Sequence, residues 1–305
     1  KTKLFYFGIK RKEAFFTDIP PVSDELIERV IRHREVELQG VVKVDLTKLA
    51  RDYLNLNRAR ELFRRFANLL PRENGKLLEI GSGFGSLIAY SLKWEGIEAY
   101  GIEPDQKRVE ICRDLLEEFN LPTDRISRSV GEAIPLPSNS VDLICSFTVF
   151  EHVQNPQRVL EESVRVLKPG GHLYFSFPNY GSWWEGHYAI LWIPYLPKWV
   201  AKLYVRLLGR NPAFLDHLQL INYRNLKQWI EELDEKVETL GLGQDIWEKR
   251  LRTLAFSEWA QLGRLKKWTG ILHRLGLIEI LIRVGRRLHW ETPFILVLRK
   301  PLLDN

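Results

Sequence analysis

Cysteine is scarce in this sequence, and long apolar runs are missing. The two cysteines, Cys112 and Cys145, cannot by themselves form a disulfide framework or a metal site, so we expect a reducing environment. The longest uncharged aromatic run, residues 186–197, is too short to span a bilayer and contains two prolines. These absences exclude a disulfide-stapled fold and a multi-span membrane protein.

The composition is that of an ordinary globular protein. Hydrophobic residues make up 45% of the 305 positions and charged residues 28%, which excludes a mostly disordered chain. This length suits two average domains of roughly 150 residues, or one α/β domain with insertions. Residues 1–16 carry scattered charges and no apolar core with a cleavage site, so we predict no signal peptide and a cytoplasmic location.

Positive charge is concentrated in one segment. The net charge is +6, and residues 261–290 contain seven arginines and lysines against one acid, Glu279, so the rest of the chain sums to zero. A single basic segment gives little support to nucleic-acid binding, and we expect no nucleic-acid partner. The sequence also shows no cluster with zinc or magnesium ligand spacing, and we predict no metal site.

Strand-like and helical patterns alternate between about residues 75 and 180, which predicts βαβ units and a parallel sheet. The expected strands are 76–80, 98–102, 125–129, 141–147 and 172–177, and the expected helices are 86–94, 105–119 and 156–167. Further along we expect a helix at 223–233, a sixth strand at 236–240 and a last strand at 293–299.

Three additions to this sheet are predicted. We expect a helical extension over residues 1–70, with helices at about 23–38 and 47–69 and Ser23 as an N-cap. The remaining segments are a core at 71–180, an aromatic lid at 181–221, a core helix and strand at 222–244, a basic helical insertion at 245–290, and a last strand and tail at 291–305.

The sharpest motif is LLEIGSGFGSL, residues 77–87. A strand carrying Glu79 is followed by Gly81, Gly83 and Gly85 and then by a helix. Glycines at alternate positions let the backbone turn tightly and approach a ligand at the carboxyl end of the strand. A dinucleotide site stays open but is weakened by Ser86, which stands at the third position of that fingerprint. A strand–helix turn that binds nothing also remains open.

The pattern E-x-G-x-G-x-G resembles the first motif of the class I S-adenosylmethionine-dependent methyltransferases. Three further segments resemble the same family in the same order: YGIEPD with Glu103, residues 129–153, and VLKPGGHLYFSFPN at 166–179. The resemblance covers residues 55–180 well and 217–241 and 292–301 moderately. It implies a doubly wound, seven-stranded Rossmann-like sheet, a methyltransferase, and S-adenosyl-L-methionine as its cofactor.

The resemblance also implies where this cofactor binds. Glu103 would accept hydrogen bonds from both ribose hydroxyls, and the glycine loop would pass the amino-acid tail. Val130 stands where family members often have an adenine-binding Asp, so adenine contact is expected from the backbone near Gly131, with the Glu132 side chain facing solvent. The expected cofactor-binding residues are Glu79, Gly81, Ser82, Gly83, Phe84, Gly85, Glu103, Pro104, Gly131, Glu132, Ala133, Ser146 and Phe147.

The acceptor side is expected at the carboxyl ends of the fourth and fifth strands. Glu151 and His152 directly follow strand 141–147, and His217 precedes the helix at 223–233; these three are the candidate catalytic residues. His187 is a weaker candidate. A histidine there could take a proton from an alcohol or phenol. Alternatively, Glu151 and His152 only make backbone hydrogen bonds in a loop, and His217 only ties the insertion to the core. Residues 150–153 also occur in cyclopropane-forming lipid methyltransferases, whose further pattern is not evident here.

Aromatic and basic residues suggest an apolar acceptor and a membrane. The aromatic side chains of the 181–221 segment predict a lid over an apolar or lipid-linked acceptor, or else a small satellite core: Trp183, Trp184, Tyr188, Trp192, Tyr195, Trp199 and Tyr204. Bases recur every four residues from Lys198 to Arg210, and Leu265 and Trp268 begin a second basic amphipathic pattern. Such helices are typical of anionic membrane surfaces, although many bury their apolar face on their own domain.

The sequence therefore predicts a methyltransferase that acts on a small-molecule or lipid-linked acceptor, at oxygen, in the cytoplasm or at the inner face of a membrane. Two alternatives remain. One is a nicotinamide-dependent oxidoreductase, and the other is a non-catalytic, membrane-associated protein with the same fold. The sequence predicts no oligomeric state.

Overall fold

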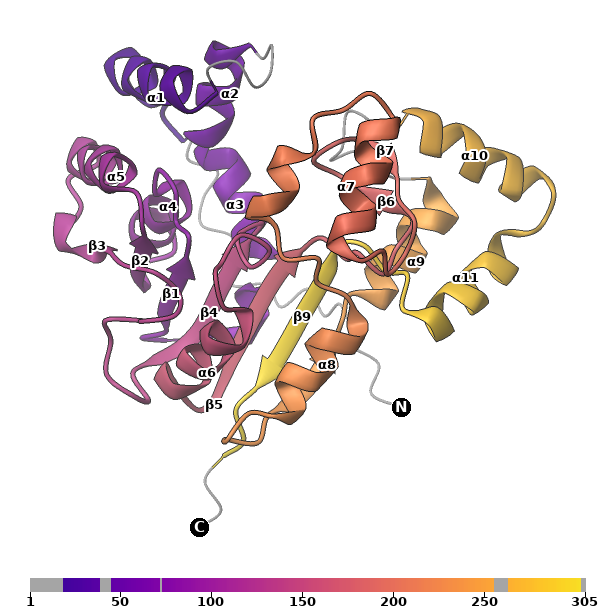
Figure 1. The fold of residues 1–305 in the computed structure, drawn as a ribbon. Helices are drawn as coiled ribbons and strands as arrows, with labels where there is room; N and C mark the ends of the chain where they lie inside the picture. Colours follow the sequence, from indigo (N-terminus) through magenta and orange to yellow (C-terminus); the bar gives the residue numbers. More distant parts are fainter. Residues whose placement is uncertain (1–18, 39–44, 72, 255–262, 303–305) are drawn as a thin grey trace. The chain divides into compact units, whose positions relative to one another are not determined.

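A seven-stranded mixed sheet organises the protein (Figure 1). The computed structural model describes residues 19–38, 45–71, 73–254 and 263–302, without the side chains of 263–268. The strand order within them is β3 (Ile126–Arg128), β2 (Glu98–Glu103), β1 (Lys76–Ile80), β4 (Val141–Phe147), β5 (Leu167–Phe177), β9 (Phe294–Arg299) and β8 (Glu238–Gly241). β1 is parallel to β2 and β4, and β2 to β3, whereas β9 is antiparallel to β5 and β8. The predicted doubly wound, seven-stranded sheet is confirmed.

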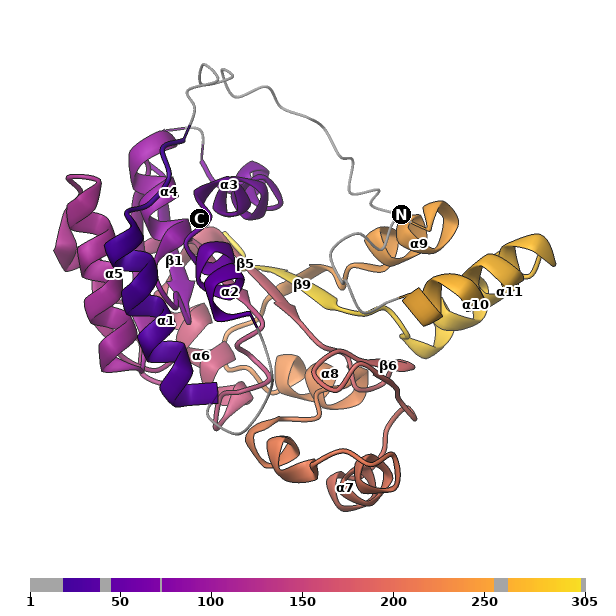
Figure 2. The same ribbon diagram turned by 90° about the horizontal axis from the view of Figure 1, so that it is seen from above.

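The chain divides into two compact units. The first extends to residue 130 and includes 134–145; the second comprises 131–133 and the chain from 146 onward. Besides its strands the first unit contains α1 (Asp24–Leu38), α2 (Leu46–Tyr53), α3 (Leu56–Arg64), η1 (Ala67–Leu69), α4 (Ser86–Trp94), α5 (Gln106–Glu118) and η2 (Thr123–Arg125). Helix α1 lies beside α5 in both views (Figures 1 and 2).

Local capping explains where the helices of the first unit begin. Ser23 Oγ accepts a weak bond from Leu26 N (3.4 Å), as expected of an N-cap. The helix predicted at 47–69 is instead broken into α2, α3 and η1. Asn55 interrupts it, because its side chain accepts a hydrogen bond from Arg58 N (3.1 Å) and so starts α3. The predicted strand 125–129 shortens to β3 because Arg125 belongs to η2.

The second unit combines the rest of the sheet with two helical insertions. Its remaining elements are α6 (Pro156–Val166), β6 (Trp184–Glu185), β7 (Ile190–Leu191), α7 (Lys198–Leu207), η3 (Pro212–His217), α8 (Tyr223–Glu231), α9 (Gln244–Thr253), α10 (Gly263–Arg274) and α11 (Ile278–Leu288). Strand β5 starts at Leu167, five residues before the predicted start. The added length is paired, since Gly170 N donates to Lys300 O and Lys300 N donates to Gly171 O, both at 2.9 Å.

The aromatic insertion forms a core of its own. Trp192 is fully buried, its ring contacts Tyr180 and Tyr204, and its Nε1 donates to Tyr180 O at 3.2 Å. Ala201 and Val205 of α7 pack into the same cluster. Trp192 is thus a core residue, which agrees with the satellite-core alternative for this side chain and not with the lid. The apolar side chain and its satisfied indole N–H fix it inside the insertion.

We therefore expect Trp192→Ala to destabilise the protein. Removing a fully buried Trp costs about 3–5 kcal/mol, from lost burial and from the cavity left behind. Urea unfolding followed by circular dichroism should show a lower midpoint. Trp199→Ala is the matched control, because Trp199 is 73% exposed. Equal midpoints for the two variants would contradict the buried placement.

Candidate functional site

The glycine loop follows β1 and leads into α4 in the first unit. Gly81, Gly83 and Gly85 have φ values of 72°, 56° and 84°, a region that favours glycine. At Gly85 a Cβ would lie 2.1 Å from Cys112 Sγ of α5, so this glycine is required for helix packing. At Gly83 a Cβ would meet nothing within 4 Å. The loop therefore leaves open space at its second glycine.

Glu103 is buried at the carboxyl end of β2 and is held against this loop. Its Oε2 accepts a hydrogen bond from Gly83 N (3.0 Å) and its Oε1 accepts one from Asp105 N (3.2 Å). Burial raises the pKa of Glu103, against the opposing charge of Arg108 and these two backbone bonds. A carboxylate offers about four lone-pair sites, so Glu103 can still accept bonds from a diol.

Glu79 on β1 is a second buried carboxyl at the loop. Its Oε2 is buried and has no hydrogen-bond partner in the described part of the chain. Burial, together with the charge of Glu103, raises the pKa of Glu79 well above its ordinary value. A buried, unpartnered oxygen is costly, and a bound cationic or hydrogen-bonding group would offset that cost. These features fit S-adenosylmethionine, which carries both a ribose diol and an ammonium group.

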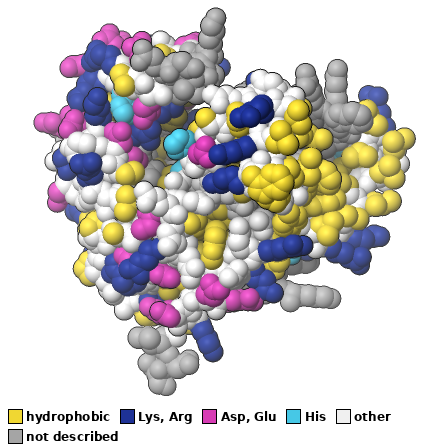
Figure 3. Space-filling view, in the orientation of Figure 1, with side chains coloured by type: hydrophobic (Ala, Val, Ile, Leu, Met, Phe, Trp, Pro, Cys, Tyr) yellow, Lys and Arg dark blue, Asp and Glu magenta, His cyan; other side chains and the backbone are white. Residues whose placement is uncertain are grey.

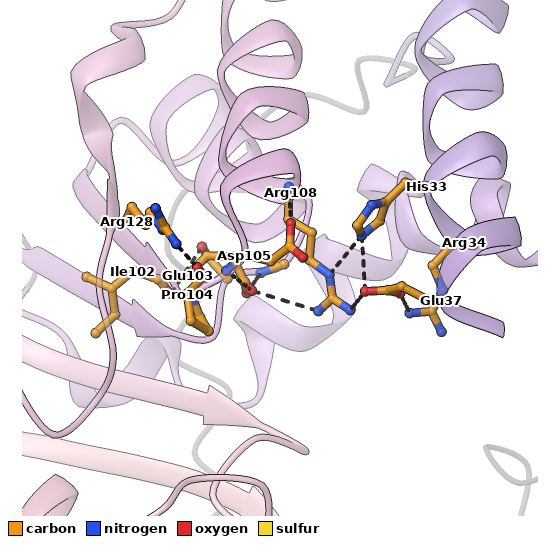
Figure 4. A network of polar contacts seen from close by, with 11 residues as sticks. His33, Arg34, Glu37, Ile102, Glu103, Pro104, Asp105, Arg108 and Arg128 are labelled. Carbon is orange, nitrogen blue, oxygen red and sulfur yellow. Dashed lines mark hydrogen bonds and ion pairs between the residues drawn. The ribbon is translucent and has the colours of Figure 1, made fainter.

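A polar network ties α1 to Glu103 (Figure 4). Arg108 of α5 donates to Glu37 Oε1 of α1 at 2.7 Å and to His33 Nε2 at 3.4 Å, and its Nη1 lies 3.8 Å from Glu103 Oε1. Burial lowers the pKa of Arg108, but the charges of Glu103 and Glu37 raise it above its usual value. Arg108 is therefore charged, and it is shared between the two carboxylates.

The loop side chains predicted to bind cofactor are also defined. Phe84 is buried against the rings of His33 and Tyr53, at centroid distances of 5.8 and 5.4 Å. Ser82 is buried, and its Oγ approaches Ile102 O at 3.5 Å. Pro104 is exposed and accepts a bond from Arg128 Nε through its carbonyl. The structure thus brings Gly81–Gly85, Glu79 and Glu103 together.

The other expected cofactor residues belong to the second unit. Gly131 and Ser146 are buried, Ala133 is exposed, and Phe147 contacts the ring of Tyr174. Glu132 is half-buried, and its Oε1 accepts hydrogen bonds from Gln154 N (2.8 Å) and Asn155 N (3.1 Å). The Glu132 side chain is therefore partly exposed to solvent, as expected, but it also binds two backbone N–H groups before α6. The binding role of all these residues stays a prediction.

A second cluster surrounds Glu151 in the second unit. The side chain of Glu151 is fully buried, and neither carboxylate oxygen has a hydrogen-bond partner in the described residues. Its Oε1 lies 3.9 Å from Nε2 of both His152 and His187. Burial raises the pKa of Glu151 to about 7. The loop is fixed by its backbone, since Gln219 N donates to Glu151 O at 2.7 Å.

Glu185 orients His187 within this cluster. The two residues are connected by a 2.7 Å contact between His187 Nδ1 and Glu185 Oε1. Glu185 is buried and also accepts bonds from Tyr188 N and the Tyr180 hydroxyl. Burial acts to lower the pKa of His187, but Glu185 and Glu151 raise it above its usual value. With Nδ1–H on Glu185, the neutral ring presents the lone pair of Nε2 towards Glu151.

The structure brings only two of the three predicted catalytic residues together. Glu151 and His152 lie in the cluster, whereas His217 is exposed at the end of η3 and makes no described hydrogen bond to them. Of the other members of this cluster, the sequence analysis named His187 only as a weaker candidate and did not name Glu185. The signal was present in W-E-G-H, which sets an acid two residues before a histidine. Trp184, adjacent to Glu185, has a buried Nε1 without a hydrogen-bond partner among the described residues.

Among the residues that the structure describes, two groups of side chains are close enough for a cation. The ligand atoms of Glu151, His152 and His187 lie within 4.8 Å of one another, and so do those of His33, Glu37 and Asp105. In the second group the guanidinium of Arg108 already bonds His33 and Glu37. In the first, the 3.9 Å separations exceed those around a tetrahedral zinc, whose bonds of about 2.0–2.2 Å bring ligand atoms closer. We assign no metal to either group.

Comparison with known proteins places these features in context. A family model described as a methyltransferase domain matches residues 78–175. An uncharacterized methyltransferase of Mycobacteroides abscessus is 27% identical over 200 residues, which are 64% of this chain and 76% of that protein. A ubiquinone biosynthesis O-methyltransferase of Yersinia pestis is 26% identical over 182 residues, covering 56% of this chain and 73% of the enzyme.

Other matches are shorter or structural. The ubiquinone biosynthesis O-methyltransferase of Pectobacterium atrosepticum is 29% identical over 104 residues, so the match spans less than half of that enzyme, 43%, and 34% of this chain. The solved phosphoethanolamine N-methyltransferase 2 of Haemonchus contortus, in complex with S-adenosyl-L-methionine, is 17% identical with a TM-score of 0.47 and covers 80% of this chain and 52% of its own.

Proposed function

Since this chain belongs to the class I S-adenosylmethionine-dependent methyltransferases, with its methyltransferase domain at residues 78–175, we propose that it methylates an oxygen of an apolar, lipid-linked acceptor. S-adenosylmethionine, when bound, supplies an electrophilic methyl group on its sulfonium. Gly81–Gly85, Glu79 and Glu103 would hold it. The family match leaves no support for a nicotinamide-dependent oxidoreductase.

The buried Glu151 carboxyl is the main observation in support of oxygen as the methyl-accepting atom. A hydroxyl that gains a methyl group must lose its proton as the new O–C bond forms, so the site needs a base. A pKa of about 7 suits Glu151 to this task, because a substantial fraction is ionised at neutral pH. His187, held by Glu185, and His152 flank the carboxyl at 3.9 Å, and the positive charge of His187 in its protonated form favours the ionised carboxylate. The O-methyltransferase names of two relatives support the same chemistry.

The lipid-linked nature of the acceptor is supported by the aromatic insertion. Glu185 and His187 belong to this insertion, and half-buried Trp184 stands next to Glu185. The insertion thus combines apolar surface with two residues of the cluster around Glu151. A lipid-linked acceptor resides in a bilayer, so we expect the protein to work against an anionic membrane at its inner face.

Trp184→Ala tests the acceptor side. We expect the KM for an acceptor with an apolar chain to rise about tenfold, because one buried aromatic contact contributes roughly 1–2 kcal/mol. The KM for S-adenosylmethionine should not change. The assay is transfer of labelled methyl to phenols with and without an isoprenoid chain, and Trp94→Phe on α4 serves as a control. An unchanged acceptor KM would remove Trp184 from the site, and transfer to amines alone would overturn O-methylation.

A further inference from the structure

Helix α7 has two apolar stripes, and its own core covers one of them. Ala201 and Val205 are buried in the aromatic insertion. Trp199, Leu203 and Leu207 follow one another at four-residue spacing and are 73%, 50% and 77% exposed. Residues four apart lie on one helix face, so these three form a continuous outward stripe. Burial on its own domain therefore does not account for it.

Helix α11 repeats this arrangement in the same unit. Ile278 and Ile282 pack on Leu251 of α9, and a Cβ on Gly285 would meet Trp247 at 2.3 Å. On another face Ile280, Val284 and Leu288, again four residues apart, are exposed. Figure 3 shows apolar side chains gathered over the part of the second unit that contains α7, α10 and α11, with Lys and Arg at its margins.

The charges beside these stripes are mostly basic. Helix α7 contains no acidic residue. The acid of α11, Glu279, forms an ion pair with Arg252, so it is compensated. Arg206, Arg210 and Arg287 have no salt-bridge partner within the described residues. Exposed apolar stripes bordered by uncompensated arginines complement a surface that is apolar inside and anionic outside.

We propose that the outward stripes of α7 and α11 dock on an anionic lipid bilayer, with Trp199 and Leu207 inserted among the headgroups. Among the described residues no helix is long and apolar enough to cross a membrane. The two helices have 10 and 11 residues, or about 15–17 Å, so they would lie in the interface. A second copy of the chain fits less well, since symmetric pairing would bring arginine margins together. Delivery of a lipid-linked acceptor rests on the proposed function, but lipid binding does not.

Vesicle co-sedimentation of the full chain tests this surface. We expect binding to phosphatidylcholine vesicles containing 30% phosphatidylglycerol, and at least about tenfold weaker partitioning to phosphatidylcholine alone. Trp199→Ser with Leu207→Ser should weaken binding to the anionic vesicles about tenfold or more. Arg206→Gln with Arg287→Gln should remove most of the preference for anionic lipid. Val36→Ser, an exposed site on α1, is the matched control and should bind as the parent does.

Two outcomes would overturn the proposal. One is equal vesicle binding by the Trp199/Leu207 variant and the parent. The other is concentration-dependent dimerisation in sedimentation velocity that this variant abolishes, without vesicle binding by the parent. Unchanged circular dichroism spectra would show that the variants fold. Vesicle binding without methyl transfer would support the docking surface and refute the proposed reaction. Methyl transfer without vesicle binding would support the reaction and refute the docking surface.

Discussion

Glu103→Ala is expected to lower the affinity for S-adenosylmethionine and S-adenosylhomocysteine about 100-fold. Two hydrogen bonds to a charged carboxylate contribute roughly 1.5 kcal/mol each, and the variant loses both ribose contacts. Isothermal titration calorimetry with the two ligands and with NAD measures the change. Strong NAD binding, or no binding of any of the three to the parent protein, would refute the cofactor assignment for this site.

Glu103 also accepts a hydrogen bond from Gly83 N, so the Glu103→Ala variant needs structural controls. Glu103→Gln keeps one acceptor oxygen for the loop and is expected to show an intermediate loss of affinity. Glu98→Ala, at the other end of β2, removes half-buried ion pairs with Lys76 and Arg125 and should leave both affinities unchanged. An equal loss in the Glu98 variant would indicate that the strand, rather than the carboxylate of Glu103, was disturbed.

Glu151→Gln is expected to lower kcat by about 10²- to 10⁴-fold with a small effect on either KM, the range for loss of a general base. In the parent, the ionised carboxylate is the active form. Activity should therefore be low at acid pH, rise as pH passes the folded-state pKa of about 7, and level off above it. This rise of activity with pH reports the whole cluster and not Glu151 alone, because Glu185, His187 and Tyr180 interact electrostatically with Glu151. In the Glu151→Gln variant this rise of activity with pH should disappear.

A merely structural Glu151 would behave differently. The carboxyl is buried without a hydrogen-bond partner, so the neutral, isosteric amide should leave the unfolding midpoint unchanged or raise it. Glu161→Gln, at a half-buried Glu on α6 paired with Arg158, is the matched control for activity. Loss of stability with a preserved rise of activity with pH would contradict the assignment of Glu151 as the base.

The sheet and the cofactor loop were predictable because their signals are local. Strand β1, the glycines and Asp105 as the cap of α5 all lie within short windows where propensity and backbone geometry act directly. Gly85 is instructive here. A Cβ at this position would collide with Cys112 of α5, so a glycine is required for helix packing. The glycine at this position of the motif is therefore little evidence for a ligand.

The cluster around Glu151 was harder to predict because its residues meet through tertiary structure. His187 and Glu151 are 36 positions apart, and nothing in either local sequence indicates that their side chains face each other. Trp192 and Trp199 are equally aromatic and belong to one insertion, yet one is core and the other exposed. Which face of a helix a short insertion buries depends on partners such as Tyr180, which a periodicity alone does not identify.

Arg108 links helix α1 to the predicted ribose-binding carboxylate, Glu103. Glu37 of α1 and Glu103 compete for one guanidinium, at 2.7 and 3.8 Å. Any event that detaches α1 would free Arg108 to approach Glu103 and occupy the acceptor sites that a ribose needs. In thermodynamic terms, docking of α1 and cofactor occupancy are linked equilibria, and each favours the other to the same extent. Helix α1 would thereby set part of the affinity for the cofactor through Arg108.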